Sequence, residues 1–222
     1  MKKILATCVL GLGFAASSQA ATVLGFEIGA GVWNTKNTLS QKSSSDLKTD
    51  SSYATNVYAA FEHPIPFIPN VRAEYLQNNN DLKKPFKGES DTSYADITLY
   101  YEILDNWVNL DLGISGRVMD AEHKTVNQSY KNDKTLGALY ARAQFDLPLT
   151  GLSIGAAAQH DAGLNGDRSM EDYSIYMQYK IGLGFGVAGG YRLQDYTLDY
   201  DKLPNEIDHE VKGAYLNVFW QF

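Results

Sequence analysis

The chain ends with the stretch Asp208-His209-Glu210-Val211-Lys212-Gly213-Ala214-Tyr215-Leu216-Asn217-Val218-Phe219-Trp220-Gln221-Phe222. Counted back from the last residue in steps of two, one set of side chains is apolar: Phe222, Trp220, Val218, Leu216 and Ala214. The alternate set is mixed polar and aromatic. Because successive side chains of a strand point to opposite faces, this alternation predicts a β-strand with one apolar face. Such a strand is long enough to cross a bilayer at a tilt, with Trp220 and Phe222 where an interfacial aromatic girdle would lie.

Residues 1–20 have the pattern of a secretory signal peptide. Lys2 and Lys3 give a positive start, an apolar stretch runs from Ile4 to Ala16, and a small-residue cleavage site precedes Ala21. We therefore expect a mature chain of residues 21–222. The single cysteine, Cys8, lies inside the segment that would be removed. The mature chain would then contain no disulfide, thiol nucleophile or zinc–thiolate site.

Composition narrows the class of protein further. The formal net charge is −7, and it becomes −9 when Lys2 and Lys3 are removed, which argues against a nucleic-acid partner. Outside the N-terminal segment there is no apolar run of about eighteen residues, so we expect no transmembrane helix. Membrane-spanning strands give a much weaker hydropathy signal. The fifteen tyrosines suit interfacial positions, because the ring is apolar and the hydroxyl is polar.

Ten stretches show the same alternation. They cover residues 22–36, 52–62, 71–78, 92–104, 107–119, 135–147, 152–161, 171–181, 183–196 and 208–222. Long polar connectors (37–51, 79–91, 120–134, 162–170 and 197–207) alternate with short turns (63–70, 105–106, 148–151 and 182). Even strand number and alternating loop length are typical of bacterial barrels, and a soluble β-sandwich gives no reason for them. We predict an all-β, antiparallel transmembrane β-barrel of ten strands, or of eight if 71–78 or 152–161 does not pair.

The apolar set of each strand should face lipid, and the alternate set should face the lumen. The alternate set carries the charges Glu27, Glu62, Arg72, Glu74, Asp96, Glu102, Asp111, Arg117, Arg142, Asp146, Asp172, Lys180 and Arg192. Both signs occur at similar depths, which favours a network of ion pairs that fills a narrow lumen. A thin water path, and hence a narrow passive channel for small solutes or ions, is the alternative, because inward glycines leave some room.

Catalysis at the outer rim is a further hypothesis, since some small barrels are enzymes. His160-Asp161, Asp195 and Asp208-His209-Glu210 lie near the predicted strand ends, and Ser169 could be posed with His160. A carboxylate could orient either histidine as a base toward water. However, neighbours along one strand point to opposite faces, so adjacent His and Asp cannot share a proton side by side. The sequence contains no cluster with metal-ligand spacing, and we expect no cofactor.

The signal segment, the ten alternating strands and the ending 208–222 resemble a family of small outer-membrane β-barrel proteins of Gram-negative bacteria with no assigned activity. The stretch Gly189-Gly190-Tyr191-Arg192 is consistent with this resemblance. It implies an outer-membrane location and no catalytic residues. The expected partners are outer-membrane lipids, lipopolysaccharide, periplasmic chaperones and the barrel-assembly machinery, which would recognise Tyr215, Val218, Trp220 and Phe222. We expect a structural or surface-interaction role, with a largely plugged lumen; the alternatives are the narrow channel and a rim hydrolase or lipid A-modifying enzyme.

Overall fold

The computed structural model describes residues 24–41, 47–48, 51–81, 88–125, 129–164, 166, 168–198 and 207–222. The expected signal segment, 1–20, lies outside these residues. In the described part, every regular element is a strand. The strands are β1 (Gly25–Gln41), β2 (Leu47–Lys48), β3 (Ser52–Glu62), β4 (Asn70–Gln77), β5 (Asn79–Asp81), β6 (Gly88–Leu104), β7 (Val108–Thr125), β8 (Ser129–Leu147), β9 (Leu152–Asp161), β10 (Ser169–Gly182), β11 (Phe185–Leu198) and β12 (Ile207–Gln221).

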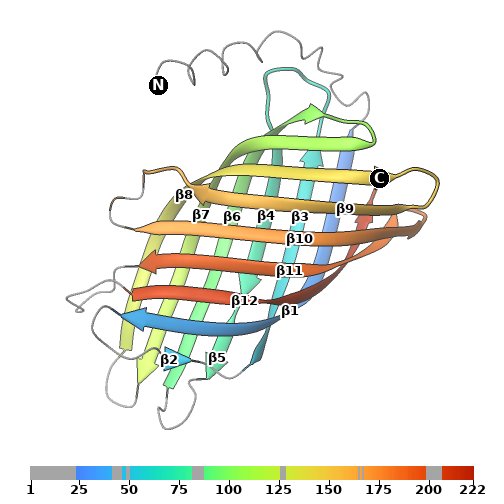
Figure 1. Ribbon diagram of the computed structural model, residues 1–222. Helices are drawn as coiled ribbons and strands as arrows, with labels where there is room; N and C mark the ends of the chain where they lie inside the picture. The colour runs from blue at the N-terminus through green and yellow to red at the C-terminus, as the bar shows by residue number, and fades with distance from the viewer. Residues whose placement is uncertain are drawn as a thin grey trace, which may run out of the picture.

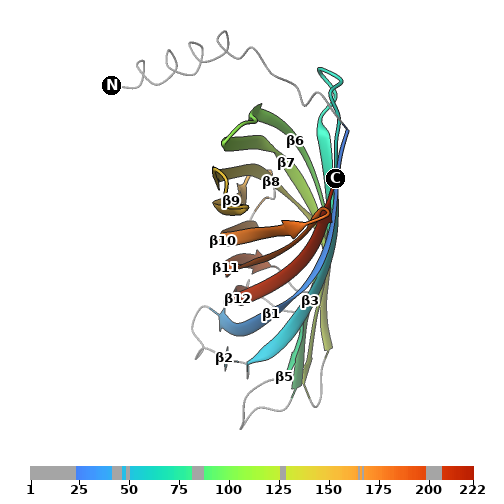
Figure 2. The same ribbon diagram turned by 90° about the vertical axis from the view of Figure 1, so that its right-hand side faces the viewer.

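These strands form one closed antiparallel barrel. Each long strand pairs with its neighbours in sequence, and β12 returns to pair with β1, with Trp220 opposite Ile28. Figure 1 shows the front strands crossing those behind at a steep angle, and Figure 2 shows β10, β11, β12 and β1 side by side along one wall. The last residue joins the closure, because Phe222 and Phe26 exchange both backbone hydrogen bonds. Among the described residues, each of the ten long strands therefore has a strand partner on both sides.

The ten-stranded prediction is confirmed, and the eight-stranded alternative is wrong. β4 pairs with both β3 and β6, and β9 pairs with both β8 and β10. The two short strands add no transmembrane crossing: β2 pairs with the distal part of β1, and β5 follows β4 after Asn78 and pairs with β6. No helix in the described residues is long and apolar enough to cross a membrane.

The predicted alternation of faces is visible in the exposure of neighbouring side chains. On β6, Asp96 is 4% exposed, whereas the next residue, Ile97, is 57% exposed. On β3, Val57 is exposed and Tyr58 is buried. The apolar side chains therefore form the outer surface of the barrel, and the alternate side chains fill its interior.

One predicted connector is wrong over most of its length. Residues 120–134 were expected to form a charged loop, but β7 continues to Thr125 and β8 begins at Ser129, with Asp120 opposite Asp133. Strand also replaces predicted loop at 37–41 and 88–91. The physical reason is that a strand that leaves the membrane can be polar on both faces. Its backbone ladder persists after the apolar alternation has ended.

The two ends of the barrel differ. The end with the turns 63–69, 105–107, 148–151 and 183–184, together with Phe222, is called the short-turn end below, and the opposite end is called the long-loop end. The C-terminus lies at the short-turn end, because the Gln221 N–H donates to the Gly184 carbonyl oxygen at 2.8 Å.

Candidate functional site

The interior of the barrel contains an apolar cluster toward the long-loop end. We call it the apolar plug; it consists of Trp33, Ala54, Leu76, Tyr94, Met119, Ala121, Leu136, Ala138, Met170, Tyr196, Leu198 and Val211. Its members come from strands all around the wall, and several lie close to the long-loop ends of their strands. The period-2 pattern did not predict this cluster. A signal was present in β8, where Leu136 and Ala138 are apolar on the face that carries Tyr140 and Arg142 further along.

Beneath the plug, Arg117 is the most enclosed charge of the lumen, with 1% of its side chain exposed. Its Nε donates to Asp96 Oδ2 at 2.9 Å, and its Nη2 donates to Asp172 Oδ2 at 2.9 Å. It also donates to the Gln159 amide oxygen and the Tyr196 hydroxyl. Arg117 thus ties β6, β9, β10 and β11 to β7, and its charge is compensated by two carboxylates.

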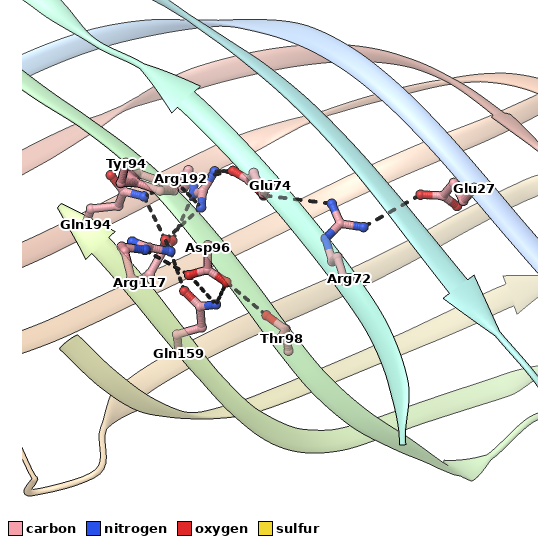
Figure 3. A network of polar contacts seen from close by, with 11 residues as sticks. Glu27, Arg72, Glu74, Tyr94, Asp96, Thr98, Arg117, Gln159, Arg192 and Gln194 are labelled. Carbon is pink, nitrogen blue, oxygen red and sulfur yellow. Dashed lines mark hydrogen bonds and ion pairs between the residues drawn. The ribbon is translucent and has the colours of Figure 1, made fainter. Parts of the chain in front are cut away.

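Arg192 is the second node of the network (Figure 3). It donates two hydrogen bonds to the carboxylate of Asp172, at 2.8 and 2.7 Å, and one to Glu74 Oε1 at 2.8 Å. Its Nη2 also donates to the Tyr94 hydroxyl at 2.8 Å, and the Gln194 amide donates to that hydroxyl and to Asp172. Asp172 therefore accepts from both arginine nodes. Such paired, hydrogen-bonded charges are the arrangement in which burial of ions is tolerated.

The network continues toward the short-turn end through Arg72. Its guanidinium nitrogens lie 3.8 Å from Glu27 Oε1 and 3.9 Å from Glu74 Oε2, and its Cζ lies 4.0 Å from the centre of the Tyr58 ring. Figure 3 shows Arg72 between these two glutamates. The contacts are longer than those of Arg117, and the side chain is about a quarter exposed to the lumen. Arg72 is therefore held more loosely than the two nodes above it.

A third group of polar contacts surrounds Arg142. It donates to the Tyr176 hydroxyl and to the Gln144 amide oxygen, each at 2.8 Å, and lies 3.4 Å from Asp111 Oδ2. Gln144 donates in turn to Asp146 at 2.8 Å. With 26% of its side chain exposed, Arg142 is the least enclosed of the four paired lumen arginines.

A cavity of about 140 Å³ lies between these arginines. Trp33 and Leu76 of the plug line it on one side, and Tyr58 and Ala188 line it on another; the last two belong, with Phe219, to a second buried apolar cluster. The charges along its wall have both signs: Arg72, Arg142 and Arg192 face Glu27, Glu74, Asp96 and Asp172. The arrangement gives the cavity no strong preference for anions or cations.

Of the charges predicted to face the lumen, the structure joins most in pairs. Glu62 accepts a hydrogen bond from the Tyr100 hydroxyl at 2.9 Å, near the short-turn end. Glu102 is half-buried near the end of β6, and Lys180 is exposed near the end of β10. At the closing strand, Tyr215 lines the cavity, whereas Val218 and Phe222 are exposed on the outside.

The candidate catalytic histidines lie on opposite sides of the wall. His160 is exposed, with Nδ1 3.0 Å from the Tyr173 hydroxyl and 3.3 Å from Glu171 Oε1. His209 is 3% exposed, whereas its neighbour Asp208 is exposed and accepts from Thr197. Ser169 pairs with Thr197 in the ladder, and His160 pairs with Glu171. Within the described residues, no group of three or more His, Cys, Asp or Glu side chains is placed to hold a metal ion.

Comparison with known proteins defines the fold. No protein-family model matches the sequence, and no curated protein matches it. Among solved structures, the outer membrane protease OmpT from Escherichia coli is similar with a TM-score of 0.57 at 8% identity, over 90% of this chain and 96% of that chain. The fold is that of a bacterial outer-membrane β-barrel. At this identity the similarity concerns the fold alone.

Two further solved structures match less well. The attachment invasion locus protein Ail of Yersinia pestis gives a TM-score of 0.41 at 12% identity, over 89% of this chain and 98% of that chain. Neisserial surface protein A gives 0.40 at 11% identity, over 87% and 96%.

The outer surface of this barrel agrees with the location of such folds. Ile28, Val57, Ile97, Leu139 and Ile175 are among the exposed apolar side chains, and each is about half exposed or more. A closed barrel with an apolar exterior satisfies its backbone internally and buries its exterior in lipid. The fold and this apolar belt together place the protein in the bacterial outer membrane.

Proposed function

We propose that this protein is an outer-membrane β-barrel with a closed lumen, which serves a structural or surface-interaction role and does not conduct solutes. The single observation that carries the proposal is the apolar plug above the Arg117 network. A water path would have to pass Trp33, Leu136 and Met170, each at most 2% exposed. It would also have to separate charges that are paired directly.

The proposal extends to the partners of the barrel. The outer belt would bind membrane lipids, and the long-loop end would meet lipopolysaccharide and whatever the loops bind. Periplasmic chaperones and the barrel-assembly machinery would act on the unfolded chain, with Tyr215, Val218, Trp220 and Phe222 as the recognised signal. No nucleic acid is expected to bind, because the chain is acidic.

The proposal assigns no reaction to the protein. His209 is enclosed on the lumen side, and His160 is exposed on the other side, so the two cannot act on one substrate together. His160 with Glu171 and Tyr173 is the remaining candidate for rim chemistry. Comparison of lipid A mass and of peptide cleavage between wild type and His160→Ala tests it, with His209→Ala as the matched variant. A product that depends on His160 would replace the proposal by an enzymatic one.

Single-channel conductance in planar bilayers tests the closed lumen, with heat-modifiable gel mobility to establish that the barrel has folded. The folded wild type should give no discrete openings. A variant that carries Trp33→Ala, Leu136→Ala and Met170→Ala should conduct small ions, because those side chains fill the plug. The matched control carries Val32→Ala, Leu139→Ala and Ile175→Ala on the exposed face and should stay silent.

Discrete openings of the wild type would refute the closed lumen. If their ion preference then changed on Arg117→Ala or Arg142→Ala, the protein would be a narrow channel with the inward charges as its filter. Silence of the wild type together with conduction of the plug variant would identify the plug as the seal.

A further inference from the structure

Three turns at the short-turn end each contain an exposed apolar residue with a left-handed backbone conformation. Phe67, Leu149 and Leu183 have φ angles of 69°, 66° and 52°, and they are the described non-glycine residues with positive φ. Their side chains are also among the most exposed in the molecule: Phe67 is 92% exposed, Leu183 is 95% exposed, and Leu149 is fully exposed. Two unfavourable features therefore coincide at each turn tip.

If the turn tips were in water, both the left-handed backbone and the exposed apolar side chain would be destabilising. A left-handed backbone strains any residue with a bulky side chain, and turns ordinarily place glycine or asparagine there. An apolar side chain at the tip of a turn also exposes its whole surface to solvent. The same combination at three separate turns indicates an apolar environment that the tips enter.

The turn backbones are attached to the lipid-facing side of the wall. The Tyr101 hydroxyl donates to the Phe67 carbonyl oxygen at 2.9 Å, and Trp220 Nε1 donates to the Leu183 carbonyl oxygen at 3.1 Å. Tyr101 belongs to the exposed apolar face of β6, and Trp220 to that of β12. The third turn is joined to β10 by the Lys180 N–H, which donates to the Gly151 carbonyl oxygen at 2.9 Å next to the exposed Tyr179.

Aromatic rings continue around this rim. Trp220 stacks near Phe222 with ring centres 5.2 Å apart, and Trp107 meets Phe145 edge-on at 5.3 Å. Trp107 lies in the fourth turn and is itself 59% exposed. Tryptophan and tyrosine favour the headgroup region of membranes. The tips are thus continuous with the aromatic edge of the lipid-facing belt.

We propose that Phe67, Leu149 and Leu183 insert into the headgroup region of the phospholipid leaflet at the short-turn end and anchor that rim in the membrane. The turns join β3 to β4, β8 to β9 and β10 to β11, so the tips are distributed around the circumference. A leaflet surrounds the barrel and contacts all of them, whereas a compact protein partner would meet one side. The inference rests on the outer-membrane location and is independent of whether the lumen conducts.

Site-directed labelling tests the insertion. Single cysteines at Leu149 and Leu183 are labelled with an environment-sensitive fluorophore in the protein refolded into phosphatidylethanolamine–phosphatidylglycerol vesicles. Leu164 provides the matched control, because it is 83% exposed and lies between β9 and β10 at the long-loop end. Labels at 149 and 183 should be quenched by lipids brominated near the headgroup and shielded from iodide. The label at 164 should be quenched by iodide alone.

A second measurement uses unlabelled protein. Leu149→Asn and Leu183→Asn relieve the left-handed strain and delete the apolar side chain. If the tips stood in water, both changes would raise the urea midpoint of unfolding from vesicles; if the tips are inserted, the midpoint should fall. Iodide quenching at 149 and 183 equal to that at 164, or a higher midpoint in the asparagine variants, overturns the insertion. A closed, silent barrel with such tips would leave the proposed function intact.

Discussion

Arg117 should be the most costly charge of the lumen to remove, and its contacts set the size of the effect. Arg117→Met keeps an unbranched apolar stem but deletes the guanidinium and its charge, and it leaves Asp96 and Asp172 without one partner each. Loss of one member of a buried ion pair costs about 3–5 kcal/mol. The lower end applies here, about 3 kcal/mol, because Arg192 and Gln194 still donate to Asp172, and Gln159 and Thr98 still donate to Asp96.

Arg72→Met is the matched control. Its side chain is 25% exposed, its two ion pairs are 3.8 and 3.9 Å long, and Glu74 keeps its pair with Arg192, so its removal should cost about 1 kcal/mol. The free energy of unfolding from vesicles is measured by urea titration, with tryptophan fluorescence and gel mobility as independent probes. The difference of about 2 kcal/mol between the two variants corresponds to roughly thirtyfold in the ratio of folded to unfolded protein.

A double-mutant cycle then tests whether the contacts themselves carry the cost. Arg117→Met combined with Asp96→Asn should show a coupling of about 1 kcal/mol or more, because the two side chains are 2.9 Å apart. Equal losses for Arg117→Met and Arg72→Met would refute the reasoning. So would a vanishing coupling, because the network would then contribute no more inside the lumen than at an exposed surface.

Two further predictions concern the seam between β1 and β12. A Cβ atom on Gly213 would lie 1.7 Å from the Asn34 carbonyl oxygen, whereas one on Gly116 would meet nothing within 4 Å. Gly213→Ala should therefore lower the free energy of unfolding by about 3 kcal/mol and reduce the fraction of heat-modifiable barrel. Gly116→Ala is the control and should change the free energy of unfolding by no more than about 0.5 kcal/mol. A normal yield of folded barrel for both variants would contradict the close approach. Trp33 Nε1 donates to the Gly213 carbonyl oxygen at 3.0 Å in a buried site. Trp33→Phe should lower the free energy of unfolding by about 1–3 kcal/mol and speed amide hydrogen exchange along this seam. Trp107→Phe, at an exposed position, is the control. Unchanged exchange in Trp33→Phe would show that the indole does not stabilise the seam.

The sequence was sufficient to predict the strands that cross the membrane and the alternation of their two faces. One period-2 pattern fixes both, since a shift by one residue would turn Ile97 inward and Asp96 toward lipid. The same signal fails outside the membrane. At 120–134 both faces are polar, so hydropathy no longer distinguishes a strand from a loop, and the β7–β8 extension was missed. The sequence also could not predict which side chains pair with a given inward charge. Arg117 meets Gln159 and Asp172 across the lumen of the closed barrel, and no spacing along the chain encodes which side chains meet there.

The order of layers inside the lumen also constrains what the barrel can do. In the closed lumen that we propose, the plug excludes water at the long-loop end, so the charges beneath it are not solvated from that side. They must be satisfied by one another, and Arg117 and Arg192 accordingly share Asp172. Toward the short-turn end the pairs become longer, at Arg72 and Arg142, and the cavity opens between them. A conducting pore would need the reverse arrangement, with solvated charges along a continuous path. Under the proposed structural or surface-interaction role, the side chains that meet other molecules therefore lie on the outer wall and at the two rims.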